Sequence, residues 1–120
     1  MKLTQKHFEI FKKSCEYWID ELKLDNWEVH YRWRKSRENR ASMNTNLSGY
    51  IATMFLSREW SNYDKITKKE IEEEIKTAAK HEIIHLLLAR LSGNGSSRFI
   101  SSDDLVEAEE ELVRKLEKIL

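Results

Sequence analysis

A long helix is the feature that most constrains how this chain of 120 residues can fold. Thr67 and Glu70 have the Thr-x-x-Glu spacing of a capping box, which predicts a helix from about Lys68 to Leu91. Its first turns are charged, but from Ala78 onward apolar residues lie on every side of the helix axis. Such a helix is buried, because its apolar side chains would otherwise face water. We therefore expect its second half to lie at the centre of the fold.

The rest of the chain predicts helices and strands that could cover this central helix. Apolar residues recur every three or four positions near the start, which is typical of an amphipathic helix. Apolar and polar residues then alternate, which is typical of a strand with one buried face, and Ser48-Gly49 between two extended runs predicts a hairpin. The predicted elements are a helix over Thr4–Leu24, a strand over Trp27–Arg34, strands over Ala41–Leu47 and Tyr50–Leu56, a flexible loop from Ser92 through Gly93, Gly95 and Ser97, and a helix from Ser101 or Ser102 to Leu120. This is an α+β fold in one domain, residues 1–120.

Composition excludes several classes of partner. Lys plus Arg and Asp plus Glu both number 21, so the formal net charge is zero and we expect binding neither to nucleic acid nor to an anionic membrane. No apolar run has the length of a signal peptide or a membrane span, so we expect a soluble, cytoplasmic protein. Cys15 is the single cysteine, which leaves His and carboxylates as metal ligands, and its place on an apolar stripe predicts core packing.

Two histidines and a glutamate lie in the apolar half of the long helix, in the sequence His81-Glu82-Ile83-Ile84-His85. Residues four apart are turned about 40° from each other, so His81 and His85 project from one face and could bind one ion. Zinc accepts such nitrogens together with carboxylate oxygens, and cobalt or nickel accept the same ligands. Glu82 lies beside that face, where a general base could meet a metal-bound water. His30 falls on the polar face of its strand, where solvation is the commoner role.

The alternative interpretation is a pair of core histidines bonded to the backbone, with Glu82 at the surface. It is disfavoured because two histidines and a glutamate buried in an apolar helix without a partner are costly. A catalytic zinc site needs a third ligand, and no third histidine follows shortly downstream. A carboxylate from the last helix is therefore expected. At 100° per residue, Glu109 lies near the middle of that helix's apolar sector, Glu110 just outside it, and Glu107 and Glu111 opposite. Glu109 is the predicted ligand and Glu110 the alternative.

With these residues the chain resembles the gluzincins, and more closely the minigluzincins and small metallopeptidase-like proteins often encoded by phages and mobile elements. The similar order covers nearly the whole chain, but only the histidine helix is a specific motif. The resemblance implies a zincin-like fold with a three-stranded mixed sheet. It also implies that the first hairpin strand, Ala41–Leu47, forms the rim of the cleft, where an extended peptide could add along the strand edge.

The expected function is peptide-bond hydrolysis by a zinc-activated water, with His81, His85 and Glu109 as metal ligands and Glu82 as general base. Its substrates would be peptides or proteins. The competing class is a catalytically silent zincin-like module that binds a protein partner, with zinc structural or absent. A closed sphere of four protein ligands would favour this second class.

Overall fold

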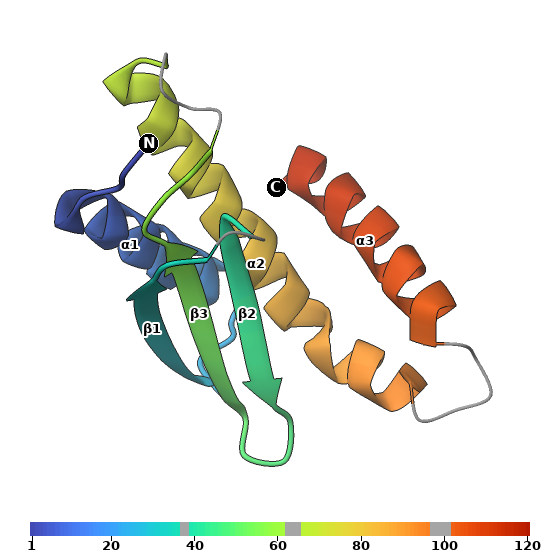
Figure 1. The fold of residues 1–120 in the computed structure, drawn as a ribbon. Coiled ribbons are helices and arrows are strands. Elements are labelled where there is room, and N and C mark those ends of the chain that lie inside the picture. Colours follow the sequence, from blue (N-terminus) through green and yellow to red (C-terminus); the bar gives the residue numbers. More distant parts are fainter. Residues whose placement is uncertain (37–38, 62–65, 97–101) are drawn as a thin grey trace.

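The computed structural model describes residues 1–36, 39–61, 66–96 and 102–120. Within these ranges the chain forms three helices and one three-stranded sheet, the predicted α+β class (Figure 1). None of these helices has the combination of length and apolar character that would let it cross a bilayer. The elements are α1 (Gln5–Glu21), β1 (Glu28–Arg34), β2 (Ala41–Asn46), β3 (Ile51–Ser57), α2 (Lys68–Ser96) and α3 (Ser102–Ile119).

The sheet is mixed, as expected. Its strand order is β1-β3-β2, with β1 parallel to β3 and β2 antiparallel to β3. Met54 of the central strand lies opposite Tyr31 on one side and Met43 on the other. Strand β2 is therefore at an edge of the sheet, and α2 packs beside it.

The β2–β3 turn is one residue longer at each end than the predicted Ser48-Gly49, because β2 ends at Asn46 and β3 begins at Ile51. The side-chain oxygen of Asn46 accepts hydrogen bonds from the Ser48 hydroxyl at 2.8 Å and the Gly49 amide at 3.3 Å. Tyr50, predicted as the first residue of the strand, lies in the turn with a φ of 52°. Its carbonyl accepts from the amide of Glu28 at 2.8 Å, and its ring packs edge-on against Trp27 at 5.1 Å. These contacts offset the cost of the left-handed backbone.

The core lies between one face of the sheet and the helices α1 and α2 (Figure 1). Cys15 is fully buried there, which confirms its predicted packing role. On the open face of the sheet, His30 is exposed with its Nε2 2.8 Å from a carboxylate oxygen of Glu28. The central contacts come from Phe11 and Cys15 on α1, Ala52, Met54 and Leu56 on β3, and Ile75, Ala79 and Ile83 on α2.

Helix α2 begins where the sequence predicts, and the Thr67 hydroxyl accepts a hydrogen bond from the amide of Glu70 at 3.1 Å. Its end was predicted wrongly, since the helix continues past Leu91 to Ser96 instead of giving way to a loop at Ser92. A glycine in a helix costs only about 1 kcal/mol relative to alanine, and each residue added to a formed helix gains a hydrogen bond. Ser97, the end of the predicted loop, lies outside the described residues.

Helix α3 packs mainly against α2, on the side away from α1 (Figure 1). Val113 of α3 and Ile84 of α2 are both fully buried. Only part of the apolar sector of α3 is covered, because Leu112 is 40% exposed and Ile119 is 78% exposed. One neighbouring helix covers only a narrow stripe of α3.

Candidate metal centre

His81 and His85 lie one helical turn apart on the face of α2 that meets α3. Their rings are 4.8 Å apart between centroids, and their Nε2 atoms are 3.2 Å apart. Both side chains are partly buried, and the intervening residues Ile83 and Ile84 are fully buried. The pair is thus presented by a buried part of the helix.

Helix α3 brings Glu110 to the same point. One carboxylate oxygen of Glu110 is 2.6 Å from Nε2 of His85, and the other is 3.8 Å from Nε2 of His81. The ligand atoms of these three residues all lie within 4.8 Å of one another. Glu110 therefore faces the same nitrogen atom of both histidines.

These three side chains suit zinc in both chemistry and spacing. Zinc is bound in proteins by imidazole nitrogens and carboxylate oxygens at about 2.1 Å in a tetrahedron, which sets neighbouring ligand atoms about 3.4 Å apart. The two Nε2 atoms, 3.2 Å apart, are close to that value. The two oxygens of Glu110 lie 2.6 Å from Nε2 of His85 and 3.8 Å from Nε2 of His81, which are distances on either side of it. The shorter one is that of a direct hydrogen bond between His85 and Glu110, so this pair would have to separate by about 0.8 Å to hold an ion.

Glu109, the predicted third ligand, contacts a different atom. A carboxylate oxygen of Glu109 lies 3.5 Å from Nδ1 of His85, on the side of the ring opposite Nε2. The geometry therefore favours Glu110, the alternative ligand, at the point where the Nε2 atoms meet. Glu107 and Glu111 are exposed, as the helical phase predicts.

Glu117 is a site residue that the sequence analysis missed. Its carboxylate contacts Nδ1 of His81, and its side chain is partly buried. The signal was its spacing, because Glu117 follows Glu110 by seven residues, two turns of a helix, and so shares its face. The cluster thus contains three glutamates of α3, namely Glu109, Glu110 and Glu117.

Glu82 lies beside the cluster and lines the cleft in front of it. Burial raises the pKa of its carboxyl group above the ordinary value. The nearby His85 and His81 act in the opposite direction, whereas the carboxylates of Glu110 and Glu117 raise the pKa further. Glu82 is therefore a carboxyl group whose proton affinity exceeds that of a surface glutamate.

A cleft of about 430 Å³ lies over the cluster and is bordered by the edge strand β2. A second hollow of about 370 Å³ adjoins it and shares four lining residues with it, Asn39, Ala41, His81 and Glu82. Ser42 and Met43 of β2 line the first cleft together with Glu109 and Glu110. The rim predicted over Ala41–Leu47 thus corresponds to a strand that borders the histidines.

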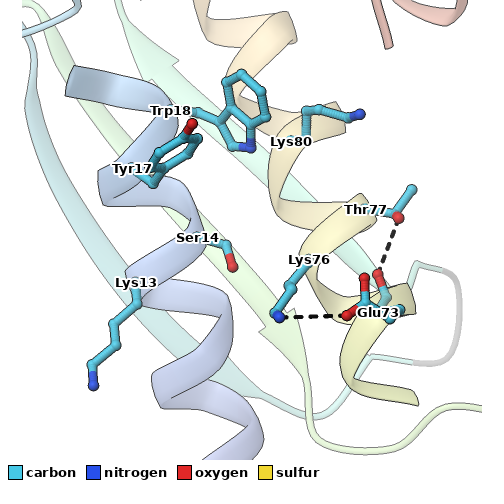
Figure 2. A pocket seen from close by; sticks show the side chains of 8 residues that line it. All are labelled: Lys13, Ser14, Tyr17, Trp18, Glu73, Lys76, Thr77 and Lys80. Atoms are coloured by element: carbon cyan, nitrogen blue, oxygen red, sulfur yellow. Dashed lines mark hydrogen bonds and ion pairs between the residues drawn. The ribbon is translucent and has the colours of Figure 1, made fainter. Parts of the chain in front are cut away.

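A separate hollow of about 400 Å³ lies between α1 and α2 and contains none of the clustered histidines or glutamates (Figure 2). Several of its polar groups have hydrogen-bond or ion-pair partners. Lys76 pairs with the carboxylate of Glu73 at 3.4 Å, and the Thr77 hydroxyl donates to the Glu73 carbonyl at 3.0 Å. Lys80 donates to the carbonyl of Glu117 at 3.0 Å. This hollow therefore has fewer groups that could bind a metal or transfer a proton than the cleft over His81 and His85.

Comparisons with protein-family models, with curated proteins and with solved structures give no match to this chain. The resemblance to gluzincins accordingly stays a prediction from the residues of the sequence.

Proposed function

We propose that this protein is a zincin-like, zinc-dependent metallopeptidase whose metal ligands are His81, His85 and Glu110. The observation that carries the proposal is the convergence of both Nε2 atoms on the carboxylate of Glu110, beside Glu82, in a cleft. Three protein ligands leave a fourth position of a tetrahedral ion open, which is the arrangement of catalytic rather than structural zinc.

Zinc at such a site supplies a Lewis acid that polarises a carbonyl group and lowers the pKa of water to about 7. The role of the protein's own Glu82 is to accept a proton from the attacking water and to return it to the leaving amine. The raised pKa of Glu82 suits this exchange, because a general base works best when its pKa lies near the pH of the reaction. Glu110, His81 and His85 would hold the zinc ion beside Glu82.

The substrate class proposed is a peptide in extended conformation. In the described part of the chain, β2 pairs with β3 alone, so its other edge is available for main-chain hydrogen bonds. Ala41, Ser42 and Met43 on this strand line the same cleft as His81 and Glu82. A peptide lying along β2 would pass in front of the candidate metal position.

The metal site is tested by the zinc content of purified protein. Wild type is expected to hold stoichiometric zinc, and the variants His81→Ala and His85→Ala are expected to lose it because each removes a ligand. His30→Ala is the matched control, since His30 lies on the open face of the sheet and should leave zinc unchanged. Stoichiometric zinc in both histidine variants of α2 would refute the site.

The identity of the third ligand is tested by comparing Glu110→Gln with Glu109→Gln. We expect Glu110→Gln to weaken zinc binding much more, because Glu110 faces the Nε2 atoms whereas Glu109 faces Nδ1 of His85. Titration of zinc against a competing chelator measures the two affinities. A larger loss in Glu109→Gln would restore Glu109 as the ligand.

The mechanism is tested by cleavage of a peptide library. Glu82→Gln is expected to retain zinc and to lower the cleavage rate by about 10²–10⁴-fold, because the amide cannot accept the proton. Unchanged cleavage by a zinc-loaded Glu82→Gln protein would contradict the role of Glu82.

One observation favours the non-catalytic alternative. Each histidine already has a carboxylate partner, Glu117 for His81 and Glu110 for His85, so the cluster could join α2 to α3 as ion pairs without a metal. Absence of zinc from wild type, together with a loss of stability in His85→Ala, would support this alternative.

A further inference from the structure

We propose that Glu117 is a positioning residue that holds His81 in the tautomer and ring orientation in which Nε2 faces the metal. The inference rests on the proposed zinc site and assigns Glu117 a role outside the ligand set. It follows from which nitrogen of His81 each glutamate of α3 meets.

The two nitrogens of His81 have different partners. Nδ1 contacts the carboxylate of Glu117, whereas Nε2 faces Glu110 and the Nε2 atom of His85. A neutral imidazole carries one N–H donor and one acceptor nitrogen, and an ionised carboxylate can only accept. The contact with Glu117 therefore requires a hydrogen on Nδ1, which leaves the lone pair of Nε2 free for an ion.

Glu117 is itself held in place by the neighbour of His81 in the sequence. The Lys80 ammonium donates a hydrogen bond to the main-chain carbonyl of Glu117 at 3.0 Å. The same ammonium lies 5.7 Å from the centre of the Trp18 ring on α1. Two successive residues of α2 thus contact one residue of α3, which holds the main chain of Glu117 beside His81.

His85 shows a looser version of this arrangement. Glu109 lies 3.5 Å from Nδ1 of His85, beyond the usual length of a hydrogen bond to a ring nitrogen. Glu117 is therefore the stronger of the two contacts, and its removal should have the larger effect on zinc binding.

The experiment measures zinc affinity and the tautomer of His81 in full-length protein. Glu117→Ala removes the acceptor, and Glu117→Gln keeps an acceptor oxygen without the charge. Glu107→Ala is the matched control, a glutamate on the exposed side of the same helix. We expect Glu117→Ala to bind zinc about 10–100-fold more weakly than the control, the usual loss when such an outer partner is removed. Glu117→Gln should recover part of that loss.

The tautomer is read in the metal-free protein from nitrogen-15 NMR of the imidazole rings at about pH 8, a pH above the unperturbed histidine value of about 6.5. Wild type should show the hydrogen of His81 on Nδ1, and Glu117→Ala should show Nε2–H or a mixture. A purely structural role for Glu117 would not change this signal. If circular dichroism shows that Glu117→Ala is unfolded, Glu117→Met takes its place, because it keeps the side-chain length but lacks the oxygen.

The results separate this inference from the proposed function. If Glu117→Ala matches the control in zinc affinity and wild type in tautomer, the positioning role is wrong, while zinc loss in His81→Ala still supports the metallopeptidase. If Glu117→Ala loses zinc as completely as His81→Ala, Glu117 is a ligand instead. A wild-type protein that binds no zinc refutes the proposed function and the positioning role together.

Discussion

His7 shows how a single residue can replace the usual partner in a helix cap. In the capping box of α1, the Thr4 hydroxyl accepts a hydrogen bond from the amide of His7 at 3.4 Å. Nδ1 of His7 in turn accepts from the amide of Thr4 at 3.0 Å. Glutamate or glutamine usually occupies this position. This cap could not be predicted from the sequence, because histidine is not among the residues that define the motif.

His7 makes the stability of the protein depend on pH. Burial lowers the pKa of its imidazole below the ordinary value of 6.5, and a proton on Nδ1 would remove the acceptor of the cap. The unfolded chain therefore binds this proton at a higher pH than the folded chain does. The stabilising contribution of His7 is complete above pH 6.5 and is lost as the pH falls below that value towards the folded pKa.

The prediction compares wild type with His7→Gln, which keeps the capping geometry but does not titrate. Denaturant unfolding at several pH values should show that wild type loses more stability than the variant as the pH falls below 6.5. The titration of every other group is common to both proteins and cancels in the difference. Parallel stability curves for the two proteins would contradict the role of His7.

At the scale of the element, α3 depends on a narrow contact with α2. Val113 is its one fully buried residue among those whose side chains are described, and it lies between Glu110 and Glu117 in the sequence. The position of Glu110, the candidate third ligand, therefore depends on the apolar side chain of Val113, which cannot itself bind a metal. Lys80 adds a polar contact near the end of the helix.

We expect Val113→Ala to lower the free energy of unfolding by about 1–3 kcal/mol, because it removes buried methyl groups and leaves a cavity. Zinc affinity should also fall, since a loosely packed α3 no longer holds Glu110 beside the histidines. Chemical denaturation and chelator competition measure the two effects. Leu112→Ala is the control, because that side chain is 40% exposed and should change both quantities less. Equal effects of the two substitutions would show that α3 is not held by Val113.

At the scale of the whole molecule, the candidate site joins two helices that are connected by a stretch outside the described residues. His81 and His85 belong to α2, while Glu109, Glu110 and Glu117 belong to α3. An ion bound by both helices would bind the folded chain far better than the unfolded one. Metal binding and folding should therefore be coupled.

Zinc at about 100 times its dissociation constant should raise the free energy of unfolding by about 2.7 kcal/mol. Thermal melting with and without zinc, followed by addition of a chelator, measures the gain and its reversal. His81→Ala supplies the control, since it lacks a ligand, and circular dichroism of this variant checks that it is folded. A stabilisation of the same size in His81→Ala would mean that zinc acts elsewhere on the chain.

Much of the fold could be predicted because it depends on local patterns. The alternation around Tyr31 predicted β1, and the spacing of Thr67 and Glu70 predicted the start of α2. The end of α2 could not be predicted in this way, because the glycines that indicated a loop are accommodated in a helix already formed. The exposed apolar residues of α3, such as Ile119, also escaped prediction, since a pattern does not tell how many neighbours cover a helix.

By itself, the sequence determined that His81, Glu82 and His85 lie together on a buried helix, because the angle between residues of a helix is fixed by its geometry. Only the tertiary structure decided that Glu110 meets the Nε2 atoms while Glu117 meets Nδ1 of His81. The physical reason is that these contacts depend on how α3 is rotated about its axis against α2. That rotation is set by packing between α2 and α3, whose residues are far apart in the sequence. Ile84 of α2 and Val113 of α3 are fully buried.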